Sequence, residues 1–88
     1  MNRNRDVTRF AAWITKYALT KGIFSATVED CSVSEMVVDT EAEYATYYHK
    51  NEWHRSKEKA VRRAEEMRTI KIASLTKSIE KINKLKFD

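Results

Sequence analysis

The clearest pattern in the chain is the helical spacing of apolar positions over its carboxyl-terminal third. From Ser56 to about Lys84 there is neither glycine nor proline, and residues that favour helices dominate. Ser56 is a natural N-cap, because its hydroxyl can accept from an unpaired N–H of the first turn. The pattern predicts one long amphipathic helix over residues 55–88. Its apolar positions fall within an arc of about 140°: Ala60, Val61, Ala64, Met67, Ile72, Leu75, Ile79, Ile82 and Leu85.

This helix is expected to extend beyond the body that supports it. About 30 helical residues span about 45 Å, whereas a compact chain of this size is roughly 30 Å across. The first turns carry Ala60, Ala64 and Met67, which suit packing against a sheet. The last turns carry large aliphatic residues at the a and d spacing of a short coiled-coil seam, namely Ile72, Leu75, Ile79 and Ile82.

Four aliphatic side chains in water would each forgo about 1.5–3 kcal/mol. We therefore expect the seam to be covered. The amino-terminal arm folding back, a second copy of the chain and a partner protein are the three alternatives.

Strand patterns precede the helix. Residues 44–54 are rich in aromatics, and period-two alternation places Tyr44, Thr46 and Tyr48 on one face and Tyr47 and His49 on the other. A turn is expected at Asn51–Glu52. Within residues 23–31, the same alternation puts Phe24, Ala26 and Val28 on one side. The antiparallel strands that we predict lie at about residues 17–30, 35–39 and 43–50.

The amino-terminal segment fits two patterns. Apolar residues from Val7 to Ala18 match helical spacing, with Asp6 as a cap and Gly22 as an end, yet residues 17–28 also fit a continuous β segment. We favour a short helix or irregular arm over residues 5–14 and a first strand from about Tyr17. The predicted fold is α+β, a three-stranded antiparallel sheet packed on one long helix. It forms a single domain, with an arm (1–16), a sheet (17–54) and the helix (55–88).

Length and composition narrow the class of protein. The chain has 88 residues with one glycine, no proline and one cysteine, so we expect one modest core with a stability of about 4–13 kcal/mol. A single cysteine excludes an internal disulfide framework, and one glycine argues against a glycine-rich phosphate loop. No apolar run approaches the ~20 residues needed to cross a bilayer, and no signal-peptide pattern is present. We therefore expect a cytoplasmic protein with no membrane partner.

Charge is segregated along the chain. Residues 1–28 carry five basic residues and one acidic residue, residues 29–54 carry one basic and seven acidic, and residues 55–88 carry eleven basic and five acidic, for a net charge of +4. In one interpretation the acidic and basic segments lie close together, and their charges offset each other within the fold. In the other interpretation a partner recognises the charge of one segment, because clustered charge selects partners.

Groups that could carry chemistry are few. Cys31, His49 and His54 match no zinc template, and no pattern assembles a nucleophile with a base or sets a pair of carboxylates apart for acid–base work. We therefore predict no enzyme activity, no metal and no cofactor. A core between sheet and helix is the preferred role for the aromatic residues, a base-stacking surface being the alternative: Phe24, Tyr44, Tyr47, Tyr48 and Trp53.

Three stretches carry a resemblance to a known group of proteins. They are YALTKGI at residues 17–23, Tyr47-Tyr48-His49 with Trp53-His54, and AVRRAEEMRTIKIASLTKSIEKINKLKF at residues 60–87. Together they resemble small, mostly uncharacterised proteins encoded by bacteriophages and prophages, which similarly combine a β segment, an aromatic strand and a terminal helix. Residues 1–16 depart from that pattern. The resemblance implies a protein that disables a host machine, such as a restriction or CRISPR complex, in the host cytoplasm, and it brings no active site.

These observations lead us to expect a non-enzymatic protein that occupies and inhibits a host protein or a defence complex. The alternative is nucleic-acid binding through Arg3, Arg5, Arg9 and the basic face of the helix, which would weaken steeply with salt. The seam also allows a homodimer. The candidate partner-binding residues are Arg55, Lys59, Arg62, Arg63, Tyr47 and His49.

Overall fold

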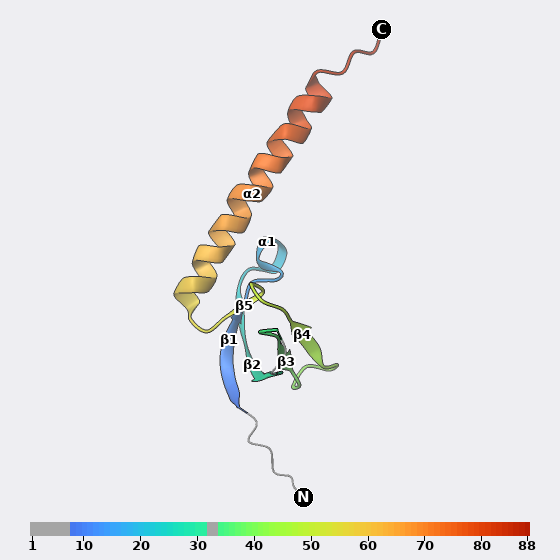
Figure 1. Ribbon diagram of the computed structural model, residues 1–88. Helices are drawn as coiled ribbons and strands as arrows, with labels where there is room; N and C mark the ends of the chain where they lie inside the picture. The colour runs from blue at the N-terminus through green and yellow to red at the C-terminus, as the bar shows by residue number, and fades with distance from the viewer. Residues whose placement is uncertain (1–7, 32–33) are drawn as a thin grey trace, which may run out of the picture.

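A curled antiparallel sheet and one long helix make up the molecule (Figure 1). The computed structural model describes residues 8–31 and 34–88. The fold is α+β, as the sequence predicts, but the sheet has five strands instead of three, in the order β4-β3-β2-β1-β5. The strands are β1 (Arg9–Ile14), β2 (Phe24–Asp30), β3 (Val37–Asp39), β4 (Thr46–Tyr48) and β5 (Trp53–His54), and the helices are α1 (Ala18–Lys21) and α2 (Lys57–Asn83).

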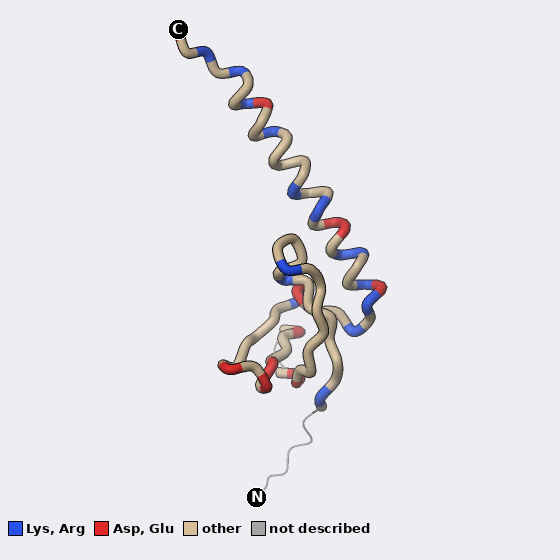
Figure 2. The backbone as a smooth tube through the Cα atoms, turned by 180° about the vertical axis from the view of Figure 1, so that it is seen from behind, with Lys and Arg blue, Asp and Glu red and all other residues tan. Residues whose placement is uncertain are grey.

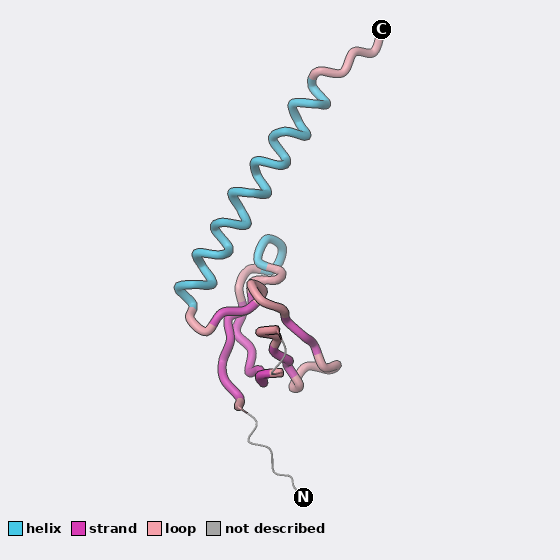
Figure 3. Tube along the Cα trace, viewed as in Figure 1, coloured by secondary structure: helices cyan, strands magenta, loops and turns pink. Residues whose placement is uncertain are grey.

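The sheet curls because its two edge strands are joined by a short connection. A flat five-stranded sheet would hold its edges about 19 Å apart, whereas the chain from Tyr48 to Trp53 spans at most about 17 Å. Asn51 makes the turn with a φ of 75°, as expected for Asn51–Glu52. The indole N–H of Trp53 donates to the carbonyl of Glu35 at 2.8 Å and ties β5 to the connection before β3. Figure 3 shows the strands wrapping around a common interior.

The core lies inside this curl. Antiparallel pairing sets Phe10 opposite Val28 and Ala12 opposite Ala26, so the inward faces of β1 and β2 meet. Val28 is fully buried and Ala26 packs against the core, whereas Phe24, predicted on the same side of the strand, is exposed. The buried cluster consists of Ala12, Ile14, Val28, Val37 and Tyr48.

The prediction of an aromatic core between sheet and helix is wrong for most of the rings. Tyr48 is buried, and Trp53 is half-buried with its ring centroid 5.6 Å from that of Phe10. Phe24, Tyr44 and Tyr47 are exposed. Because the sheet closes on its own inner face, that face is covered without a helix above it.

The amino-terminal prediction is also wrong. Residues 9–14 form a central strand instead of an arm or a helix, and the expected first strand from Tyr17 is interrupted by α1. Phe10 and Ile14 are four residues apart, a separation that lies on one face of a helix and also on one face of a strand. Gly22 does end a helix, with a φ of 79° that favours glycine. The predicted strands at 35–39 and 43–50 occur as the shorter β3 and β4.

The long helix forms as predicted and stands apart from the body. The hydroxyl of Ser56 accepts from the N–H of Lys59 at 3.2 Å, and α2 then continues for 27 residues, or about 40 Å. Ala60 is fully buried, whereas every residue from Arg68 onward is exposed. The molecule measures 75 × 26 × 23 Å, because α2 projects well past the sheet (Figure 1).

Candidate functional site

The first candidate site is the apolar seam on the projecting half of α2. We call Ile72, Leu75, Ile79 and Ile82 the distal α2 surface. Their exposed fractions are 55%, 50%, 58% and 63%, although isoleucine and leucine are usually buried in soluble proteins. Leu85 and Phe87 continue the exposed apolar character toward the end of the chain. Exposed apolar stripes are a common feature of interaction sites, so this one is a candidate.

The body of the protein packs on a different line of α2. Ala60 is buried, Ala64 and Met67 are half-buried, and this line is rotated by roughly 70° from the distal α2 surface at 100° per residue. Residues 9–14 belong to β1, so this part of the predicted arm does not fold back over the seam. Residues 1–7 of the arm lie outside the described residues. A second copy and a partner protein are the other two covers expected from the sequence.

Two cations bracket the distal α2 surface. Arg68 lies on the line of the seam, about one turn before Ile72, and Lys86 follows Ile82 along the chain, beyond the end of α2 at Asn83. A guanidinium nitrogen of Arg68 lies 3.1 Å from a carboxylate oxygen of Glu65, and both side chains are exposed. Such a surface pair is worth about 0–1 kcal/mol, so it leaves Arg68 available to a partner.

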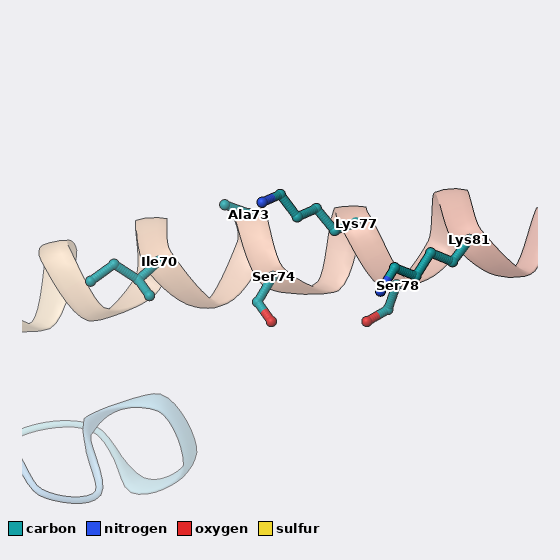
Figure 4. A pocket seen from close by; sticks show the side chains of 6 residues that line it. All are labelled: Ile70, Ala73, Ser74, Lys77, Ser78 and Lys81. Atoms are coloured by element: carbon teal, nitrogen blue, oxygen red, sulfur yellow. The ribbon is translucent and has the colours of Figure 1, made fainter.

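The opposite side of α2 is basic. A shallow hollow of about 420 Å³ runs along it (Figure 4) and is lined by Ile70, Ala73, Ser74, Lys77, Ser78 and Lys81. Nearer the body, Leu19 of α1 reaches α2 and lines a second groove of about 310 Å³ with Met67 and Ile70. The projecting helix therefore has an apolar face and a separate cationic face.

The second candidate site lies at the base of α2. His54 is carried by β5, and the other lining residues come from the first turns of α2 at spacings of three and four residues, which places them on one face. We call this hollow of about 230 Å³ the His54 pocket, and it is lined by His54, Lys59, Arg62, Arg63 and Glu66.

Buried polar contacts position His54. Thr15 is fully buried, and its hydroxyl donates to the carbonyl of Asn51 at 3.2 Å and lies 3.2 Å from Nε2 of His54. A hydroxyl has a single proton, so the imidazole must donate through Nε2–H and leave Nδ1 unprotonated. Burial lowers the pKa of His54 below its ordinary value, the charges of Arg63 and Lys59 lower this pKa further, and a hydrogen bond with the backbone of Asn51 opposes the shift.

The lowered pKa of His54 predicts a loss of stability in mild acid. The unfolded chain, with an imidazole pKa of about 6.5, takes up the proton before the folded chain does. The contribution is fully present above about pH 6.5 and is lost as the pH falls through the folded pKa. We expect the free energy of unfolding, measured in urea at about pH 7.5 and about pH 5.5, to fall more in the native sequence than in His54→Gln. The exposed His49→Gln should behave like the native sequence, and an equal fall in all three would contradict the shift.

The predicted partner-binding residues do not form one site. The structure brings Lys59, Arg62 and Arg63 together in the His54 pocket, but the guanidinium carbon of Arg55 lies 3.8 Å from the ring centroid of Phe10. Arg55 therefore stacks on a side chain at the edge of the core. Tyr47 belongs to β4, and His49 is the first residue after β4. β4 is one edge of the sheet and β5, next to the His54 pocket, is the opposite edge.

The predicted nucleic-acid contacts are divided. Arg9 is engaged, because its Nε donates to a carboxylate oxygen of Glu29 at 2.9 Å. Arg3 and Arg5 lie outside the described residues. Cys31 is not an activated nucleophile: burial and the charges of Asp30 and Glu29 raise the pKa of its thiol, which keeps it protonated near neutral pH.

Charge is separated in space as well as along the chain. Figure 2 shows a group of acidic residues on the strands and loops of the sheet, and basic residues that alternate with fewer acidic ones along α2. The arginines of α2 that form ion pairs use glutamates of the same helix: Arg62 pairs with Glu58, Arg63 with Glu66 and Arg68 with Glu65. The acidic residues of the sheet therefore do not take part in these three ion pairs, and they leave the positive charge of α2 available to a partner.

Sequence reasoning missed the His54 pocket because it assigned Thr15 to the arm and predicted no strand at Trp53–His54. The one available signal was the row of cations at Lys59, Arg62 and Arg63 directly after a histidine. Within residues 8–31 and 34–88, no cluster of three or more His, Cys, Asp or Glu side chains suits a metal ion, and no helix combines the length and apolar character that crossing a membrane requires. Comparison with known proteins finds no matching family model, no matching curated protein and no matching solved structure.

Proposed function

We propose that this protein is a non-enzymatic binding protein that inserts the distal α2 surface into an apolar groove of a host protein or defence complex and thereby blocks it. The observation that carries the proposal is the row of four aliphatic side chains, each at least half exposed, on a helix that projects from the body. Spacings of three, four and three residues are those by which amphipathic helices anchor in grooves. The resemblance to phage-encoded proteins supports a host target.

The charges around the seam favour a groove with an acidic rim. Arg68 precedes the apolar row on the same line of α2, and Lys86 follows the row beyond the helix end. In a parallel pair of copies Arg68 would face Arg68 of the other copy. Like charges oppose this arrangement, whereas an acidic group at the rim of a groove would pair with Arg68.

The energy available is of the right size for a specific complex. Half-exposed aliphatic side chains regain about half of the 1.5–3 kcal/mol of full burial, so the four together would contribute about 3–6 kcal/mol. Micromolar affinity corresponds to about 8 kcal/mol. The rest of the binding free energy would have to come from Leu85, Phe87 and the two cations. These groups would also have to offset the loss of translational and rotational freedom on association.

The direct test replaces two anchors. Leu75→Lys combined with Ile79→Lys puts charge in the centre of the seam while keeping good helix formers. We expect the double variant to keep its helix content by circular dichroism and to lose affinity for the captured host partner at least tenfold, or about 1.4 kcal/mol. Partners would be captured from bacterial host lysate, identified by mass spectrometry and measured by calorimetry.

The matched control changes the basic face and leaves the seam intact. Lys77→Gln combined with Lys81→Gln should reduce affinity far less than the seam variant. The proposal is wrong if the seam variant binds like the native sequence. A doubled mass in light scattering that the seam variant abolishes would instead assign the distal α2 surface to a second copy of the chain.

The basic face of α2 supports nucleic-acid binding as a second candidate. The observation that favours it is that five cations share one side of α2, in a group near its base and a group near its end: Lys59, Arg62, Lys77, Lys81 and Lys84. Binding to phosphates weakens steeply as salt rises, in proportion to the phosphates neutralised, whereas binding through aliphatic anchors does not. The same assay would be repeated with duplex DNA as the ligand. If DNA is the partner, binding should be abolished by Lys77→Gln with Lys81→Gln and also by half-molar salt. Leu75→Lys with Ile79→Lys should leave DNA binding unchanged.

A further inference from the structure

The His54 pocket has an uncompensated positive charge. Three of its five lining side chains are the cations Lys59, Arg62 and Arg63, and Glu66 is the one carboxylate. With His54 neutral, the lining carries a net charge of +2. The carboxylate of Glu58 is 4.0 Å from Arg62, and both of these side chains are largely exposed, so this pair offsets little of the charge.

Arg63 is incompletely satisfied within the pocket. One of its terminal nitrogens pairs with Glu66, but its Nε is buried and has no hydrogen-bond partner among the described residues. A buried N–H without an acceptor costs about 1–3 kcal/mol, and folded proteins retain few of them. This orphaned donor, on a guanidinium that lines a cationic hollow, points to an acceptor that residues 8–31 and 34–88 do not provide.

The protonation of His54 would respond to a negative group in the pocket. Its Nε2 lies 3.2 Å from the hydroxyl of Thr15, which fixes the ring, and in the Nε2–H tautomer Nδ1 is the atom that would take up a proton. The neighbouring cations now disfavour that proton. An anion in the pocket would reverse this effect, because it would offset the charges of Lys59 and Arg63.

We propose that the His54 pocket binds an oxyanion, a phosphate or carboxylate group, held by the guanidinium groups of Arg62 and Arg63 and the ammonium group of Lys59. Guanidinium groups bind such oxygens with two parallel N–H bonds, and the ammonium group adds a point charge. The oxyanion competes with Glu66 for Arg63. The pocket lies at the base of α2, so this proposal stands or falls separately from that for the distal α2 surface.

The test titrates the full-length protein with inorganic phosphate and, separately, with acetate, against chloride at equal ionic strength. Nuclear magnetic resonance would follow the Nε–H of Arg63 and the imidazole of His54. We expect saturable shifts at both groups with a dissociation constant of about a millimolar or below, together with a rise in the pKa of His54. Saturation by phosphate alone supports a phosphate ligand, and saturation by acetate supports a carboxylate ligand.

Variants separate this site from general attraction to a basic helix. Arg63→Lys keeps the charge but removes the planar fork, and it should weaken binding about tenfold. The exposed Lys59→Gln should leave the fold intact and weaken binding about threefold. Lys77→Gln with Lys81→Gln, far along α2, should change nothing. Shifts that match those in chloride, or unchanged binding in Lys59→Gln, would overturn the proposal.

Discussion

Replacing Ile14 by alanine should bring the protein close to unfolding. Ile14 is fully buried at the centre of the curled sheet, in contact with the cluster formed by β1, β2, β3 and β4. Removing buried methyl and methylene groups from an isoleucine costs about 2–5 kcal/mol. The expected total for a chain of this length is only about 4–13 kcal/mol. Urea unfolding followed by circular dichroism should show the midpoint fall sharply with an unchanged slope.

The same chemical change on α2 provides the control. Ile79→Ala removes the same atoms from a side chain that is 58% exposed, and alanine is the better helix former. Its free energy of unfolding should stay within about 0.5 kcal/mol of the native value. If the two variants were equally destabilised, the distal α2 surface would be part of the folding core and would not be available to a partner.

Local signals explain why α2 was predictable to within two residues at its start, although it ends at Asn83 and not at residue 88. A serine cap, acidic Glu58 in the first turn and a long stretch without glycine or proline all act between neighbours along the chain. The curled sheet depends instead on contacts that no local pattern encodes. β1 has two alanines and a pair of large residues four apart, which fit either period, and β5 has only two residues and therefore no period at all.

The two candidate sites differ in the same way. The distal α2 surface lies on one helix, so a helical wheel was sufficient to find it. The length of that helix, compared with the diameter of a compact chain, was sufficient to predict that it extends beyond the body. The His54 pocket and its support combine Thr15 after β1, His54 of β5 and the first turns of α2. These segments are nearly forty residues apart in the case of Thr15 and His54. Their meeting follows from β5 returning to pair with β1, which could not be inferred once β1 had been assigned to an arm.

Truncation of α2 is the second change with a large expected effect, because the projecting half of the helix is separate from the body. Ending the chain after Ser74 removes Leu75, Ile79 and Ile82 but keeps Ala60, the groove beneath Leu19 and the whole His54 pocket. Since no residue of α2 beyond Met67 is more than partly shielded, the free energy of unfolding should change by no more than about 1 kcal/mol. Binding to the captured host partner should be abolished.

Small-angle scattering and denaturant unfolding together make this truncation decisive. The radius of gyration should fall well below the 18.5 Å of the full chain, toward the value of about 12 Å expected for a compact chain of this size. The full-length seam variant is the matched control, because it should lose the same binding while keeping the extended shape. If the shortened protein unfolded, the last turns of α2 would be needed to hold the sheet together. If it folded and still bound the partner, the aliphatic row would not be the contact surface.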